Sequence, residues 1–230
     1  MKKLFKGWTK FEVIFLIVSL CAITICFLFN KDKNIISLIT SLLGVFVVLT
    51  GAKGLIVSPF INIFYNILYI IISLSQKYYG EVLIYVFLMM PLHITTIISW
   101  IKNKSNKDSN IVSINKLNKK EYMVLGLVTV LVTFMFYYIL KLLNTNELMI
   151  STISLTASLV ASYLMLRRSS NYAIAFVIND VILITLWGIA CFNDIALLPM
   201  VVTFMVFFVN DIYGFISWKK REKEQYKKES

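Results

Sequence analysis

The stretch NYAIAFVINDVILITLW, residues Asn171–Trp187, decides the fold. It is apolar and of membrane length, yet Asn179 and Asp180 stand near its middle. A carboxylate at the centre of a bilayer costs roughly 3 kcal/mol on insertion scales, so chains tolerate one where it faces a protein interior or a wet cavity. We therefore expect this segment to line a path for a solute, with the other helices forming the walls of that path.

The composition indicates a polytopic membrane protein. Of the 230 residues, 59% are hydrophobic and 15% are charged, and the mean hydropathy is +0.79. Soluble domains carry about 25% charged residues. Cys21, Cys26 and Cys191 lie inside apolar runs, so we expect small buried apolar side chains rather than disulfide partners or metal ligands.

Eight apolar runs divide the chain, and each is close to the length of about 20 residues that a bilayer requires. We expect helices over residues 11–28, 35–50, 55–75, 82–101, 122–143, 148–166, 171–192 and 195–218. No small-residue cleavage site follows the first run, which predicts a retained helix rather than a removed signal peptide. Pro59 falls in the first turn of the third run, where proline is tolerated, and Pro91 interrupts the fourth.

The basic residues predict the orientation. With both termini on one side, that side holds 19 of the 23 lysines and arginines, all except Lys31, Lys33, Lys77 and Lys141. The positive-inside rule makes this side cytoplasmic. The net charge of +11 therefore reflects topology, and we expect no nucleic-acid partner.

The two halves of the chain resemble each other. Run four ends IISWIKNK with Trp100, and run eight ends FISWKKRE with Trp218, 118 residues later. A similar shift lays runs one, two and three over runs five, six and seven, in the same orientation. This pattern is typical of a parallel repeat, in which substrate binds near the midplane between the halves. The alternative is that two helices end alike because both are anchored at a membrane interface.

Polar and aromatic residues share a face of run seven. Tyr172, Phe176, Asp180 and Trp187 lie close to one helix face, with Asn179 beside it. Aromatic rings next to a carboxylate and an amide suit a flat heterocycle carrying hydroxyl groups. The alternative is a structural polar cluster of the kind that holds membrane helices together.

Two further runs carry embedded polar groups of their own. Asn210 and Asp211 precede Trp218 by two turns in run eight. His93, the single histidine, follows Pro91 in run four and corresponds to Asp211 in the repeat. Both a binding role and a helix-contact role stay open for these residues.

Run three adds a third polar face. Asn62, Asn66 and Tyr69 are spaced by four and three residues, which places them together on one side of the helix. Asparagines in membranes also bridge helices, so a structural role stays open. Eight small hydroxyl residues of runs two and six are assigned to close helix packing: Ser37, Thr40, Ser41, Ser151, Thr152, Ser154, Thr156 and Ser158.

Patterns of catalytic chemistry are absent from the sequence. The single histidine has no evident nucleophile partner, and no phosphate-binding loop or metal-ligand spacing occurs. We expect no enzymatic activity, no metal and no cofactor. A lipid-modifying membrane enzyme would need such a cluster, and a non-transporting scaffold or receptor would use the embedded polar residues only to hold helices together.

Six stretches carry a family resemblance: WTKFE at Trp8–Glu12, AKG at Ala52–Gly54, YYGE at Tyr78–Glu81, MPLH at Met90–His93, NDVI at Asn179–Ile182 and VNDIYGFISW at Val209–Trp218. In order and spacing they resemble the PnuC-type nicotinamide riboside (vitamin and nucleoside) transporter family. The resemblance implies an all-α membrane protein of eight transmembrane helices, a SWEET-like 3+1+3 repeat plus one N-terminal helix.

That implied architecture divides one transmembrane domain, residues 1–230, into five parts. They are the extra N-terminal helix in 1–33, a first three-helix bundle in 34–101, a basic loop and linker helix in 102–147, a second bundle in 148–218 and a cytoplasmic tail in 219–230. The resemblance also implies import by facilitated diffusion, trapping by a cytoplasmic kinase, and a homotrimer.

The chain departs from the family in run seven. Family members that carry nicotinamide riboside share a WxxW pair there, and alignment on Asp180 puts Ala173 and Phe176 at those positions. Family relatives that carry thiamine, riboflavin or deoxynucleosides show that the scaffold accepts other cargo, so those solutes stay open as alternatives.

Together these observations predict an importer in the cytoplasmic membrane, working by alternating access on a vitamin or nucleoside. The expected substrate-binding residues are Asn66, His93, Tyr172, Phe176, Asn179, Asp180, Asn210 and Asp211. Pro91 and Gly214 are expected to act as hinges.

Overall fold

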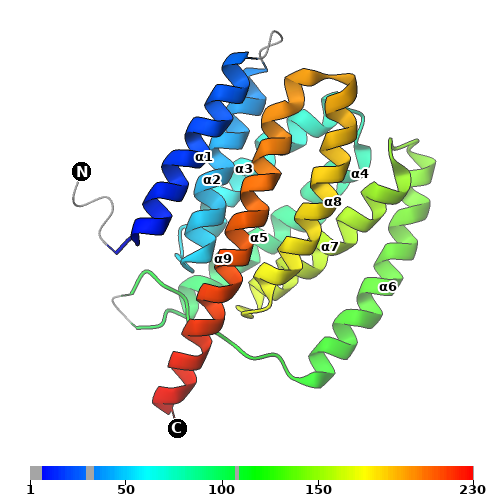
Figure 1. Ribbon diagram of the computed structural model, residues 1–230. Coiled ribbons are helices and arrows are strands. Elements are labelled where there is room, and N and C mark those ends of the chain that lie inside the picture. Colours follow the sequence, from blue (N-terminus) through cyan, green and yellow to red (C-terminus); the bar gives the residue numbers. More distant parts are fainter. Residues whose placement is uncertain (1–6, 30–33, 107–108, 230) are drawn as a thin grey trace.

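The computed structural model describes residues 7–29, 34–106 and 109–229, which form an elongated bundle of helices (Figure 1). Eight helical segments in these ranges are long and apolar enough to cross a membrane, which confirms the predicted number. The elements are α1 (Lys10–Phe29), α2 (Ile35–Ala52), α3 (Ser58–Ser75), α4 (Tyr79–Ile84), the π-helix η1 (Tyr85–Met89), α5 (Met90–Lys102), α6 (Lys119–Leu142), α7 (Leu148–Leu166), α8 (Tyr172–Asn193), the 3₁₀ turn η2 (Ile195–Leu197) and α9 (Leu198–Glu229).

Helix starts follow from local sequence. Asn34 caps α2 by accepting a hydrogen bond from the Ser37 amide at 2.9 Å. Asn118 and Glu121 form a reciprocal capping box at the start of α6. Pro59 lies in the first turn of α3, as predicted.

The third helix starts later than predicted, at Ser58 rather than at Leu55. Leu55 instead pairs with Ile111 in an isolated antiparallel bridge, and the Ile56 amide donates to the Asn110 carbonyl at 2.9 Å. Leu55 and Ile56 therefore hold the loop that follows α5, and the helix begins only after them.

The fourth crossing, α4–η1–α5, changes its helical pitch immediately before Pro91. Proline lacks an amide hydrogen and its ring crowds the carbonyl four residues earlier. The chain responds with the wider π-turn at Tyr85–Met89, a device found where helices are kinked or strained. The predicted interruption at Pro91 is thus present as a local widening.

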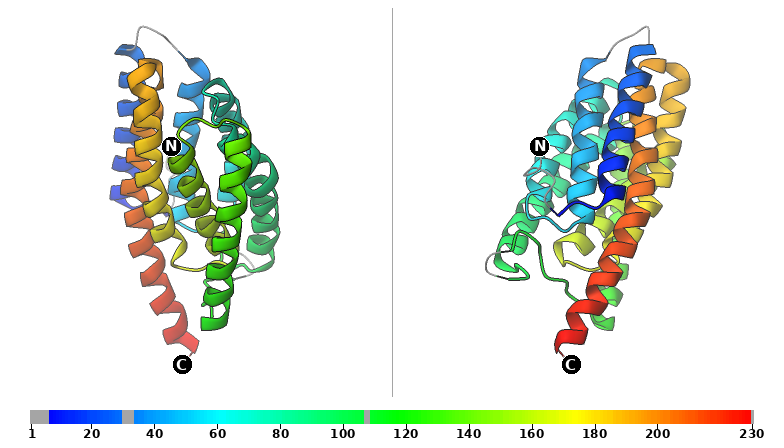
Figure 2. Two further views of the ribbon diagram at one scale, coloured as in Figure 1. Left: turned by 90° about the vertical axis from the view of Figure 1, so that its right-hand side faces the viewer. Right: turned by 60° about the vertical axis from the view of Figure 1, so that its left-hand side comes forward.

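Six helices form a closed ring. Around it α2 packs on α3, α3 on α5, α5 on α7, α7 on α8, α8 on α9, and α9 returns to α2. The two remaining helices lie outside. α1 packs against α2 and α9 (Figure 2, right), and α6 packs against α7 and α4, so each outer helix covers one seam between the two halves. The SWEET-like repeat stays a prediction, and this arrangement favours it.

The charged end of the chain is an extension of the last crossing. α9 runs unbroken to Glu229 and projects beyond the bundle at the end where α1 begins (Figure 1). The loop between α5 and α6 is attached to it, because Gln225 bonds to both the amide and the carbonyl of Ile114, at 2.9 and 3.0 Å.

The expectation of buried cysteines is wrong. All three are free thiols, but Cys21 is exposed and Cys26 and Cys191 are only half-buried. Their helices present apolar faces to the surroundings, so an apolar run did not imply a position inside the protein.

Candidate functional site

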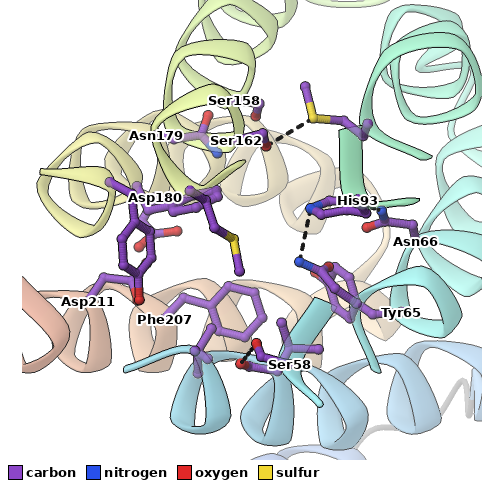
Figure 3. A pocket seen from close by; sticks show the side chains of 18 of the residues that line it. Ser58, Tyr65, Asn66, His93, Ser158, Ser162, Asn179, Asp180, Phe207 and Asp211 are labelled. Carbon is purple, nitrogen blue, oxygen red and sulfur yellow. Dashed lines mark hydrogen bonds between the residues drawn. The ribbon is translucent and has the colours of Figure 1, made fainter. Parts of the chain in front are cut away.

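A cavity of about 80 Å³ lies at the centre of the ring, with walls supplied by all six of its helices (Figure 3). Most of the residues that the sequence predicted for a site line this cavity. They are Asn66, His93, Tyr172, Phe176, Asn179, Asp180 and Asp211. The structure therefore brings together, from four separate crossings, side chains up to 145 residues apart in the chain.

One wall of the cavity is neutral and fully hydrogen-bonded. The two ring nitrogens of His93 contact the side-chain amides of Asn62 at 3.1 Å and Asn66 at 2.8 Å. A neutral imidazole donates from one nitrogen and accepts at the other, so one of the two amides presents its oxygen to the ring. Both polar atoms of His93 are thus engaged by α3, and its ring face is what remains for a ligand.

The opposite wall carries two acids. The side chains of Asp180 on α8 and Asp211 on α9 lie next to each other (Figure 3) and are only 2% and 7% exposed. Oδ2 of Asp180 has no hydrogen-bond partner, and Oδ1 of the neighbouring Asn179 has none either. In Figure 3 these acids lie across the cavity from Asn66 and His93.

The two walls correspond under the predicted repeat. Shifting Asn62 by 118 residues gives Asp180, and the same shift takes His93 to Asp211. The amide–imidazole pair of the first half is thus expected to correspond to the pair of carboxyl groups in the second.

Asn210 is the predicted site residue that does not line the cavity. Its side-chain amide donates to the Val48 carbonyl at 2.9 Å and to Asp211 Oδ1 at 3.1 Å. It joins α9 to α2 and orients Asp211.

Aromatic rings close most of the remaining surface of the cavity. Tyr172 and Phe176 meet edge to face with their ring centroids 6.0 Å apart, and Tyr172 also packs on Trp218 at 4.7 Å. Four more rings line the cavity, those of Tyr65, Tyr85, Phe204 and Phe207.

Ala173 points elsewhere. It is fully buried but does not line the cavity, and a Cβ placed on Gly214 of α9 would lie 3.7 Å from its Cβ. Of Ala173 and Phe176, the two positions at which the resemblance predicts an aromatic pair, only Phe176 reaches the cavity. The same contact gives Gly214 a packing role between α8, α9 and Ala52. Its role as a hinge stays a prediction.

Sequence reasoning missed several lining residues. Ser158 of α7 was assigned to helix packing and Ser162 was not considered, yet both line the cavity, and the hydroxyl of Tyr65 is a buried group without a partner there. Their spacing along the helices could have indicated that they share a face. Ser158 and Ser162 are four residues apart, and Phe204 and Phe207 share a face with Asp211 at intervals of three and four.

At one end of the bundle, polar contacts join the two halves. The buried Glu81 of α4 accepts hydrogen bonds from Tyr69 of α3 at 3.3 Å and from Ser154 of α7 at 3.2 Å. Trp187 of α8 donates its indole N–H to the Tyr69 hydroxyl at 2.9 Å, and its ring packs against that of Tyr69. Tyr78 adds a bond to the Leu186 carbonyl.

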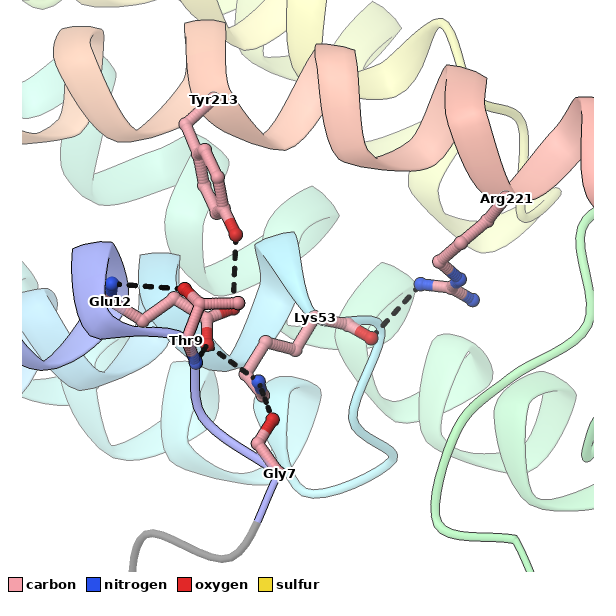
Figure 4. Close-up of polar contacts among 6 residues, drawn as sticks. All are labelled: Gly7, Thr9, Glu12, Lys53, Tyr213 and Arg221. Atoms are coloured by element: carbon pink, nitrogen blue, oxygen red, sulfur yellow. Dashed lines mark hydrogen bonds and ion pairs between the residues drawn. The ribbon is translucent and has the colours of Figure 1, made fainter.

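The other end anchors α1 (Figure 4). Thr9 and Glu12 form a capping box, and the Glu12 carboxylate also accepts from Lys53 at 2.8 Å and Tyr213 at 3.2 Å. Arg221 donates to the Lys53 carbonyl at 2.9 Å. Glu12 therefore caps α1 and joins it to α2 and α9.

A ring of membrane-length helices around a central cavity that aromatic and polar side chains line is the architecture expected of a membrane transporter. Residues 34–220 match the family model described as nicotinamide mononucleotide transporter, and the chain belongs to that family. The matched region begins after α1, so this helix lies outside the part that defines the family.

Two known proteins of this kind are similar to the chain. It is 25% identical over 223 residues to the nicotinamide riboside transporter PnuC of Neisseria mucosa, covering 95% of this chain and 84% of that protein. It also shares the fold of a crystal structure of the vitamin B3 transporter PnuC, with a TM-score of 0.84, 24% identity and 96% of each chain covered. The family expected from the six stretches of sequence is confirmed.

Proposed function

We propose that this chain imports a nicotinamide riboside-like vitamin or nucleoside by alternating access and facilitated diffusion. The observation that carries the proposal is the central cavity, in which Tyr65 OH, Asn179 Oδ1 and Asp180 Oδ2 are buried without partners among aromatic rings. Family membership and the name of the Neisseria mucosa relative support the choice of cargo.

The unpartnered atoms have a physical consequence. A buried polar group without a hydrogen bond costs about 1–3 kcal/mol, and a cargo that supplies hydroxyl or amide groups removes that cost. The rings of Tyr172 and Phe176 provide apolar surfaces for a heterocycle. The cavity thus suits a molecule with one flat ring and several polar groups.

The size of the cavity requires motion. Pockets that hold drug-sized ligands measure about 300–1,000 Å³, whereas this one measures about 80 Å³. A nucleoside therefore enters only after side chains or whole helices move apart. The two halves meet along the seams covered by α1 and α6, and these seams are the places where such a movement would occur.

The proposal includes an orientation, a fate for the cargo and an assembly. Both termini face the cytoplasm, which the distribution of the basic residues supports. A cytoplasmic kinase traps the cargo, and the protein forms a homotrimer in the cytoplasmic membrane. Pro91, beside the π-turn, and Gly214 permit the helix movements.

Binding and uptake test the proposal together. The purified protein is heated with nicotinamide riboside, thiamine, riboflavin and deoxynucleosides in turn, because a ligand that binds the native state raises its apparent stability. We expect nicotinamide riboside to give the largest shift. In proteoliposomes without a membrane potential, its uptake should stop when the internal and external concentrations are equal, and a pH difference across the membrane should not change that level.

The other outcomes have distinct meanings. A larger shift with thiamine, riboflavin or a deoxynucleoside would assign the same fold to that cargo. Binding without uptake would favour a receptor, and accumulation above the external concentration would contradict facilitated diffusion. No shift with any of these solutes would contradict the proposal as a whole.

A further inference from the structure

We propose that Asp180 and Asp211 form a charge-selecting pair, which makes the cavity prefer cargo with a positive charge on its ring. The proposal rests on the function proposed above and deepens it, because it names the charge class of the cargo and the side chains that select it.

The first observation is a pair of acids without a basic partner. The carboxyl groups of Asp180 and Asp211 are buried beside each other on one wall of the cavity (Figure 3). None of the described residues that line the cavity is a lysine or an arginine. Arg221, further along α9, donates to the carbonyls of Lys53 and Val112 and packs over the ring of Trp218. A buried charge left without a counterion is strongly unfavourable, and a cationic cargo would supply that counterion.

The second observation is independent of the acids. Asn179 Oδ1 and the Tyr65 hydroxyl are buried, line the same cavity and have no partner. Both therefore await a polar ligand. Aromatic rings on four helices face that space, and ring faces attract cations, most strongly where water is excluded.

The third observation indicates how the cargo is oriented in the cavity. In the first half, Asn62 and His93 occupy the positions that correspond to Asp180 and Asp211, and they form a neutral wall whose polar atoms already bond to each other or to Asn66. Only the wall of α8 and α9 offers negative charge. We infer that the charged ring of the cargo lies against α8 and α9, and that its neutral part points to α3 and α5.

A matched pair of ligands tests the proposal on the unaltered protein. Nicotinamide riboside has a cationic ring, and its dihydro form differs by one hydride and is neutral. Dissociation constants of both are measured by calorimetry on the full chain in nanodiscs. We expect the cation to bind at least tenfold more tightly. Equal affinity, or tighter binding of the neutral form, would overturn the proposal.

Variants then test the residues. In Asp180→Asn and Asp211→Asn, we expect the ratio of neutral to cation dissociation constants to fall at least tenfold. Ser158→Ala, at another lining position, should change both constants by a similar factor and leave their ratio unaltered. An unaltered ratio in both aspartate variants would overturn the assignment of these residues. If the variants do not fold, the comparison on the unaltered protein decides.

The two proposals fail differently. If the protein binds neutral nucleosides or riboflavin but neither form of nicotinamide riboside and no thiamine, charge selection is wrong and vitamin or nucleoside transport stands. If it binds none of these solutes, the proposed function is wrong and charge selection falls with it.

Discussion

The rings of Trp100 and Trp218 pack against each other with their centroids 5.9 Å apart, and each donates its indole N–H to the opposite half of the protein. Trp100 bonds to the Met165 carbonyl at the end of α7, and Trp218 bonds to the Gly51 carbonyl at the end of α2, both at 3.1 Å. Each tryptophan thus lies on the last helix of one half and bonds to the end of the first helix of the other. The two bonds form a reciprocal clasp between the halves.

The clasp predicts a loss of stability when either donor is removed. Trp100→Phe and Trp218→Phe keep a ring but leave a buried carbonyl without its partner, which costs about 1–3 kcal/mol. For a chain of this size that corresponds to a fall in melting temperature of about 2–4 °C per kcal/mol. Thermal unfolding in detergent measures the change. Ile216→Val on the exposed face of α9 is the control, and equal melting temperatures in all variants would contradict the clasp.

This pair also shows what the sequence could predict. The shared SW–K endings were sufficient to align the halves, because a repeated helix end requires no knowledge of packing. The same shift related His93 to Asp211. It did not reveal that Trp100 and Trp218 touch, since contacts across a pseudo-symmetry axis depend on how the halves are rotated.

Other residues show where sequence reasoning ended. Leu55 was assigned to a helix because it is apolar, but a backbone bridge to Ile111 takes it into a turn. Asn210 looked equivalent to Asp211, yet one residue along a helix is a rotation of about 100°, and this turns it toward α2. Ser158 was assigned to packing because its side chain is small, and only the ring of six helices shows that it faces a cavity.

The ring of Phe176 is expected to contribute to the affinity for cargo. Phe176→Ala removes a ring from the cavity and should weaken binding of a heterocyclic cargo by about 1 kcal/mol or more, roughly fivefold. Ile178→Ala, on the exposed face of α8, should leave affinity unaltered. Calorimetry with the best ligand of the thermal screen measures both, and equal affinities would show that Phe176 does not contact the cargo.

Ala173→Trp should not restore the family's aromatic pair. Ala173 is packed where α8 meets α9 near Gly214, and a large side chain there overpacks the contact at a cost of about 1–3 kcal/mol or more. We expect reduced thermal stability and no gain in affinity for nicotinamide riboside. A stable variant with tighter binding would contradict this placement of residue 173.

Breaking the ion pair between Glu12 and Lys53 should lower the stability of the protein without changing its affinity for cargo. Glu12 is 3% exposed and its removal leaves Lys53 without its ion-pair partner. Because Lys53 lies at the end of the bundle with some access to water, we expect Glu12→Gln to cost about 1–3 kcal/mol, less than for a fully buried pair. Cargo affinity should stay within twofold, since α1 lies outside the ring. A double-mutant cycle with Lys53→Met measures the coupling, and additive effects would contradict the ion pair as the source.

The contacts of Trp187 are expected to limit opening of the cavity at the end of the bundle far from Glu12. Its bond to Tyr69 and the bond of Ser154 to Glu81 join the two halves there, so Trp187→Phe should make opening at that end more frequent. In a background without Cys21, Cys26 and Cys191, a cysteine at the cavity position Ser158 reports access to a membrane-impermeant thiol reagent. We expect Trp187→Phe to accelerate labelling from the outside. Trp218→Phe, which loosens the opposite clasp, should not do so. Similar labelling rates in the two variants would show that Glu81, Tyr69 and Trp187 hold the fold together without acting as a gate.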